Sequence, residues 1–167
     1  MLTGWKEPIV LDKDADIVNM KPLADDGDTY IIYNDGYKDE FYMLENRQKQ
    51  GNEAGLYASG LMITHIDYSQ AWEANDVNTT RERYAIMAAD NSKARTIPDV
   101  EGDLYPFNGN NSFGNTTIPA ATLNHANTDG SKLRNKEITD ITQNADGTIS
   151  FKFRNNNTTG ISEINVE

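Results

Sequence analysis

Polar and charged side chains interrupt two segments that otherwise have the composition of buried β-strands. Residues 41–48 (FYMLENRQ) carry Glu45, Asn46 and Arg47 behind an apolar run, and residues 60–68 (GLMITHIDY) carry His65 and Asp67. A histidine beside a carboxylate has the chemistry of an oriented acid–base pair. Burying such groups costs free energy unless each one is paired. These five residues therefore form either a satisfied structural network or a site, and we favour the network.

The alternation of a β-strand decides which of these side chains share a face. Glu45 and Arg47 should lie on one face of the first strand together with two apolar residues, Phe41 and Met43. His65 and Asp67 should lie on one face of the second strand together with Leu61 and Ile63. We expect the five polar residues to contact one another, with the Arg47 guanidinium forming a fork against a carboxylate. A hydrolase built from His65, Asp67 and Glu45 is the least favoured hypothesis.

Zinc chemistry within this chain is disfavoured by the available ligands. The sequence has no cysteine, and its two histidines, His65 and His125, lie far apart with no HExxH pair. Thiolate sites, cysteine nucleophiles and the helical zinc-peptidase motif are therefore all absent. We assign no catalytic residue and no cofactor to the chain itself.

Calcium is the metal that the remaining oxygen ligands suit best. Asn75, Asp76 and Asn78 follow Asp67 at close spacing and form a weak candidate site. The acidic stretch 99–103 is a second weak candidate. The acidic residues of 12–16 do not complete an EF-hand loop, because Ile and Leu stand where that loop needs Gly and Glu.

Composition restricts the partners of the chain. Its 167 residues include 26 Asp and Glu against 15 Lys and Arg, for a net charge of −11. Nucleic-acid backbones and anionic membranes would be repelled, so we expect neither as a partner. No apolar run approaches the length of a membrane-spanning helix, and the first residues do not resemble a signal peptide.

The elements that position these residues are mostly strands. Residues 29–33 (TYIIY) and 41–48 flank an Asn-Asp-Gly turn, and residues 137–142 and 148–153 flank a second turn. Residues 83–89 suit either a strand or a short helix, whereas 91–135 is a long stretch with little periodicity, of the kind that is functional or packed on the surface. We predict a single all-β domain, mainly antiparallel and sandwich-like, with seven to nine strands, long irregular loops and few or no helices. Its core spans 4–153, followed by a polar tail over 154–167.

The order of several short motifs resembles the immune inhibitor A family of secreted bacterial zinc metallopeptidases. The family has a segment like YFLLENRQ followed by GLLIWHID, similar to FYMLENRQ and GLMITHIDY here. Further similarities follow in the same order over roughly residues 4–153: Gly4-Trp5, Trp72 with 75–78, RYAIMAAD, DLYP with Ser112-Phe113, and the closing DGTISFKF. The resemblance implies that 83–90 is a strand.

The zinc-binding HExxH helix of that family is missing from this chain. The resemblance therefore implies a non-catalytic C-terminal β domain, with zinc held by the parent enzyme, which hydrolyses peptide bonds in protein or peptide substrates. It also implies secretion or display at the bacterial cell surface, and an upstream catalytic domain as partner, met through an apolar docking face. The alternative is a free-standing extracellular glycan- or protein-binding module that uses Trp72, Tyr105, Phe107 and the 91–135 loop.

Overall fold

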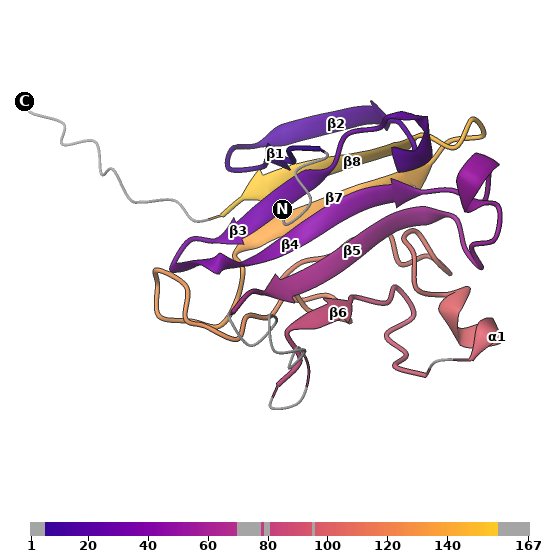
Figure 1. Ribbon diagram of the computed structural model, residues 1–167. Coiled ribbons are helices and arrows are strands. Elements are labelled where there is room, and N and C mark those ends of the chain that lie inside the picture. Colours follow the sequence, from indigo (N-terminus) through magenta and orange to yellow (C-terminus); the bar gives the residue numbers. More distant parts are fainter. Residues whose placement is uncertain (1–5, 70–77, 79–80, 95, 157–167) are drawn as a thin grey trace, which may run out of the picture.

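Two β-sheets form the protein, as the strand pattern predicts (Figure 1). The computed structural model describes residues 6–69, 78, 81–94 and 96–156. Within these residues there are eight strands: β1 (Ile9–Val10), β2 (Ala15–Met20), β3 (Tyr30–Asn34), β4 (Tyr37–Arg47), β5 (Gly60–Asp67), β6 (Tyr84–Ile86), β7 (Lys136–Gln143) and β8 (Ile149–Asn155). The described helices are short: η1 (Leu23–Asp25), η2 (Gly51–Glu53) and α1 (Ile97–Val100). The predicted fold class, all-β and sandwich-like, is confirmed.

The first sheet has five strands in the order β1-β3-β4-β5-β6, and the second has three in the order β2-β8-β7. All pairs are antiparallel except β1 with β3. The segment 83–89, ambiguous by composition, forms the edge strand β6 beside β5. Strand β8 runs to Asn155, so the first two residues of the expected polar tail belong to the sheet.

The β3–β4 hairpin follows from its turn residues. The Asn34 side chain accepts a hydrogen bond from the Gly36 N–H at 2.9 Å, which closes the turn locally. A Cβ atom at Gly36 would collide with the backbone of Ala126 and Asn127. Glycine is therefore required here by the close approach of the 126–127 segment.

The register between β4 and β5 sorts their side chains into two faces. Tyr42 lies opposite His65, and Leu44 lies opposite Ile63, on the face that looks toward the second sheet. Met43 lies opposite Thr64 on the other face, which we call the outer face. The side chains that were predicted to share a face on each strand do so.

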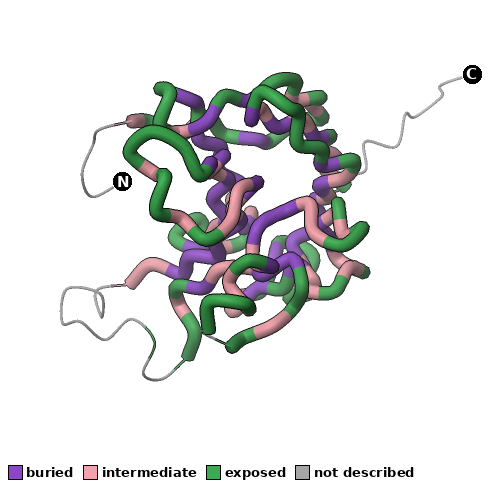
Figure 2. The backbone as a smooth tube through the Cα atoms, turned by 90° about the vertical axis from the view of Figure 1, so that its right-hand side faces the viewer, coloured by how far each residue is buried: buried purple, intermediate pink, exposed green. Residues whose placement is uncertain are grey.

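The hydrophobic core fills the space between the two sheets, where buried segments gather (Figure 2). It also contains four residues of the long irregular segment: Tyr105, Phe113, Ala121 and Leu123. The expectation that 91–135 forms a surface or functional loop is therefore wrong for these residues. A three-stranded sheet cannot cover a five-stranded one, so this segment completes the second layer. None of the described helices is long and apolar enough to cross a membrane.

Candidate functional site

The five polar residues predicted to form one network lie in three separate places. His65 and Asp67 lie at one end of the β4–β5 pair, on the core face, whereas Asn46 lies on the same face at the opposite end. Glu45 and Arg47 project from the outer face. The predicted contact among all five is wrong, because the antiparallel register pairs Arg47 with Gly60 and Asn46 with Leu61; of the five, Glu45 and Arg47 form an ion pair. A hydrolytic set of His65, Asp67 and Glu45 is not assembled, since the sheet separates Glu45 from the other two.

The partner of His65 is Glu40, a fully buried carboxylate that the sequence analysis did not select. His65 Nε2 lies 2.8 Å from Glu40 Oε1, and the Asn34 side-chain amide donates to Oε2 at 3.0 Å. The backbone N–H groups of Asn124 and His125 donate to the same carboxylate at 2.5 and 3.0 Å. We call these five residues the Glu40 cluster. It fastens the 124–125 segment to β3, β4 and β5.

Hydrogen bonding controls the protonation of Glu40. Burial acts to raise the pKa of this carboxyl group, but the hydrogen bonds from His65, Asn124, His125 and Asn34 outweigh it and lower the pKa to about 2. The cluster therefore holds Glu40 ionised, which suits a structural anchor and not a general base near neutral pH.

Asp67 is buried beside the cluster and serves a similar role. Arg81 Nη2 lies 2.7 Å from Asp67 Oδ2, the Asn124 amide donates to the same oxygen at 2.8 Å, and His125 Nε2 lies 3.2 Å from Oδ1. Both carboxylate oxygens are thus in contact with protein groups. His125 stacks on Tyr37 with ring centroids 3.9 Å apart.

The two calcium candidates that the structure describes, Asp67 and Asn78, both hydrogen-bond to protein groups. Asp67 is engaged as described, and the Asn78 side chain accepts hydrogen bonds from the N–H groups of Arg83 and Tyr84. Asn75 and Asp76 lie outside the described residues. In the part of the chain that is described, no three His, Cys, Asp or Glu side chains form a group able to hold a metal ion.

Asn46 joins the two sheets at the far end of β4. Its amide donates to the carbonyl oxygens of Met20 and Gly147 at 2.8 and 2.9 Å, and its oxygen accepts from Gln48 at 2.8 Å. A buried amide whose donors and acceptor are all satisfied is a structural element.

Glu45 and Arg47 form an ion-pair triad with Glu53 on the outer face. Arg47 Nη1 lies 3.6 Å from Glu45 Oε2, and Arg47 Nη2 contacts Glu53 Oε1. The fork predicted for Arg47 therefore exists, with Glu45 as one partner and Glu53, from η2, as the other. The Arg47 side chain is 26% exposed, so solvent weakens the pairing.

Replacing Arg47 with alanine is expected to lower the free energy of unfolding by about 1–2 kcal/mol, since it leaves a partly buried Glu45 without its counter-ion. Desolvation already raises the pKa of Glu45, and removing Arg47 removes an opposing influence. Urea unfolding of Arg47→Ala measures the cost, with the more exposed Arg154→Ala as control. A loss above about 3 kcal/mol would instead indicate a fully desolvated pair.

The ionisation of Glu40 should make stability depend on acid pH. Its pKa is lower in the folded protein than in the unfolded chain, so the stabilisation is complete above about pH 4.5 and is lost as pH falls toward 2. The shift corresponds to roughly 3 kcal/mol. Carbon-13 NMR titration of the Glu40 carboxyl group tests this directly, and a midpoint near 4.5 would contradict it.

Two buried cations were also missed by the sequence analysis. Arg134 lies between Tyr42 and Phe113, with its guanidinium carbon 4.9 and 4.8 Å from their ring centroids. Lys136 Nζ lies 2.8 Å from Asp35 Oδ2 and donates to the Tyr33 carbonyl at 2.9 Å. The sequence offers a signal only for Lys136, which directly precedes the predicted strand 137–142 and lies two residues before Ile138, on the same face.

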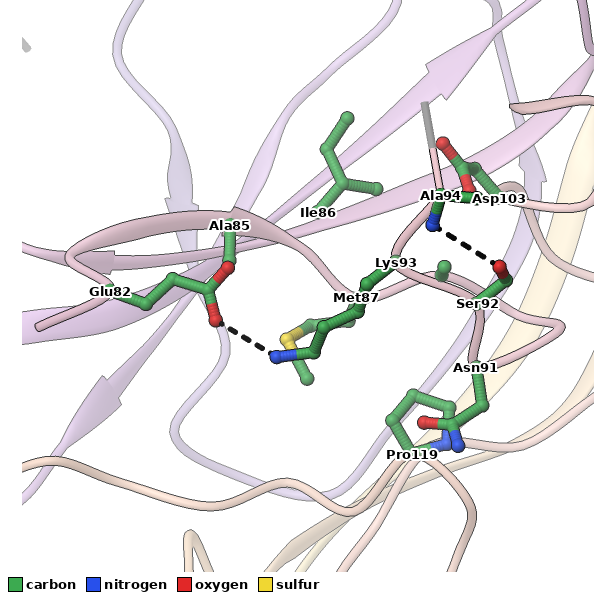
Figure 3. Close-up of a pocket in the computed structure, with 11 residues that line it drawn as sticks. Glu82, Ala85, Ile86, Met87, Asn91, Ser92, Lys93, Ala94, Asp103 and Pro119 are labelled. Atoms are coloured by element: carbon green, nitrogen blue, oxygen red, sulfur yellow. Dashed lines mark hydrogen bonds and ion pairs between the residues drawn. The ribbon is translucent and has the colours of Figure 1, made fainter. Parts of the chain in front are cut away.

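Two cavities flank β6. The smaller, of about 70 Å³, lies beside Met87 and Pro119, and Lys93 crosses toward Glu82 at 3.3 Å at its edge (Figure 3). The larger is an apolar groove of about 380 Å³ that runs between Tyr57 and Ile97 over the outer-face residues Met62 and Ile86. The first has room for little beyond solvent, whereas the second reaches the size of ligand-binding pockets.

Comparison with known proteins finds no matching family model, no curated protein and no solved structure similar to this chain.

Proposed function

We propose that this chain is a non-catalytic C-terminal β domain of a secreted bacterial zinc metallopeptidase, and that it docks on the catalytic domain of the same polypeptide. The order of motifs shared with the immune inhibitor A family motivates the proposal. Zinc and peptide hydrolysis belong to that upstream domain, because the described residues offer no matching ligand set. A calcium site at 75–78 stays a subsidiary proposal.

The observation that carries the proposal is a pair of uncharged rows of side chains on the outer face of the five-stranded sheet, beside the charged residues Glu45 and Arg47. One row of side chains crosses all five strands (Val10, Ile31, Met43, Thr64, Ile86), and the next crosses four (Tyr33, Phe41, Ile66, Tyr84). The side chains of Ile31, Met43, Thr64 and Ile66 are buried, whereas the row ends Val10 and Tyr84 are 48% and 44% exposed. A face turned to water would normally carry polar residues.

The connectivity of the chain points to the upstream catalytic domain as the partner that covers this face. The first described strand, β1, is the edge of this sheet, and Val10 lies in the first uncharged row. A domain preceding β1 in the same polypeptide would enter beside this face. The Glu40 cluster supports a non-catalytic role, because the carboxylates of Glu40 and Asp67 are both occupied by contacts with protein groups.

The test is association of this chain with the HExxH-containing region encoded upstream in its full reading frame. We expect the isolated chain with added zinc to leave casein uncut, and to form a complex with that region by analytical ultracentrifugation. Tyr84→Lys and Val10→Lys should weaken the complex at least tenfold. Val18→Lys, at an apolar site on β2 that is 70% exposed, should change it less than twofold. A reading frame with no HExxH region, or no complex, would overturn the proposal.

The glycan-binding alternative loses structural support. Tyr105 is fully buried in the core, and Phe107 packs against it. The Tyr105 ring is therefore not available to stack on a sugar, whereas Phe107 is only partly buried. Trp72 lies outside the described residues.

A further inference from the structure

The groove at the Arg47 end of the outer face combines apolar walls with an acidic rim. Its floor consists of Met62 and Ile86, from the neighbouring strands β5 and β6. Tyr57, after η2, and Ile97, in α1, also line the groove and are 52% and 54% exposed. Large apolar side chains that remain this exposed around a concave surface mark a binding site more often than a folding requirement.

The charge around the groove is negative. Arg47 is the cation among the described residues that line it; its two terminal nitrogens contact the carboxylates of Glu45 and Glu53, whereas its Nε atom is buried with no hydrogen-bond partner. One oxygen of Glu53 is buried with no hydrogen-bond partner. The Arg47 triad therefore carries an excess of one negative charge.

The part of the groove lined by α1 and the residues that follow it adds further carboxylates. Asp103 lines the groove, and Asp99 lies in α1 between the lining residues Ile97 and Val100. The Asp99 Oδ2 atom is buried with no hydrogen-bond partner. The Asp99 side chain as a whole is half-buried, so its carboxylate adds negative charge beside the groove.

We propose that this groove binds a peptide segment in which a large apolar side chain is flanked by lysine or arginine. The apolar side chain would occupy the space over Met62 and Ile86, between Tyr57 and Ile97. The flanking cations would meet the carboxylates of Glu53, Asp99 and Asp103 at the rim. Charge complementarity selects a basic segment over an acidic one, because the net −11 charge of the chain adds repulsion against acidic partners.

This inference is independent of the accessory-domain proposal, since it concerns a peptide bound by the chain alone. The probe is a capped, fluorescein-labelled heptapeptide with a central phenylalanine and two lysines on each side, measured by fluorescence anisotropy. We expect a Kd of about 10–100 µM at 50 mM salt, weakened about threefold or more at 500 mM salt. A peptide with glutamates in place of the lysines, and one with alanine in place of the phenylalanine, should each bind at least tenfold more weakly.

Matched variants locate the site. Ile97→Ser and Tyr57→Ser should weaken binding at least fivefold, whereas Val18→Ser, an exposed apolar residue on β2, should leave it within twofold. Asp99→Asn and Asp103→Asn should reduce both affinity and salt dependence, with Asp39→Asn, at the other end of β4, as control. Equal binding of the glutamate peptide, unchanged affinity in Ile97→Ser and Tyr57→Ser, or no binding at 1 mM peptide (about −4 kcal/mol) would each overturn the proposal.

Discussion

Replacing Glu40 with alanine is expected to lower the free energy of unfolding by about 3–5 kcal/mol. The substitution removes the acceptor for two backbone N–H groups, those of Asn124 and His125, and for the Asn34 amide. These donors lie near the turn of the β3–β4 hairpin. Because Glu40 is fully buried, water cannot readily take the place of its carboxylate. Each donor left without an acceptor costs about 1–3 kcal/mol. Urea unfolding followed by circular dichroism gives the measurement.

The control for Glu40→Ala is Glu82→Ala, which removes an exposed carboxylate paired with Lys93 and should cost less than about 0.5 kcal/mol. Hydrogen exchange provides a second readout, because the amides of Asn124 and His125 should lose protection in Glu40→Ala. A loss of stability below about 1 kcal/mol would mean that the 124–125 segment is held by other contacts.

Replacing Arg134 with methionine is expected to lower the free energy of unfolding by about 2–4 kcal/mol. Arg134 is fully buried, and desolvation lowers its pKa to about 10. It donates to the carbonyl oxygens of Phe113 and Lys136 at 2.9 Å. Methionine fills similar volume without donors, so both carbonyls lose a partner and the cation–π contacts with Tyr42 and Phe113 are lost.

An Arg134→Met variant that loses no stability would also have a physical explanation. Buried charges are expensive to desolvate, and replacing them with apolar residues of similar volume is neutral or stabilising in some proteins. An Arg134→Met variant as stable as wild type would show that desolvation cancels the hydrogen bonds here. Arg154→Met is the control: this arginine of β8 has a side chain that is 38% exposed and pairs with Asp16, so the change should cost less, about 0.5–1 kcal/mol.

Much of the sheet architecture is predictable from local sequence. Residues 30–34 carry β-branched and aromatic side chains, and the Asn-Asp-Gly turn that follows closes on itself through Asn34. The alternation of Phe41, Met43, Glu45 and Arg47 correctly places all four on one face. Each of these features depends on neighbours a few residues away, so the sequence contains the information directly.

The candidate site was much less predictable. Sequence reasoning selected His65 and Asp67 but paired them with Glu45 and Arg47, whereas the structure gives His65 the carboxylate of Glu40. The error has one cause: a strand pattern shows which residues share a face but not which residue lies opposite on the neighbouring strand. The 60–67 strand pairs so that Asp67 meets Glu40, which places its polar end against the start of β4.

Local chemistry was therefore sufficient for the five longer strands that were predicted and their hairpin turns, and for the two faces of β4 and β5, because these depend on dihedral preferences and on a period of two residues. The partners of the buried polar groups depended on the folded chain. Asn124 reaches Glu40 across 84 residues, and Phe113 joins the core from a segment with no periodicity. Such contacts form because three strands cannot cover five and buried carboxylates need donors. Both requirements involve residues far apart in the sequence, so no local sequence pattern reveals them.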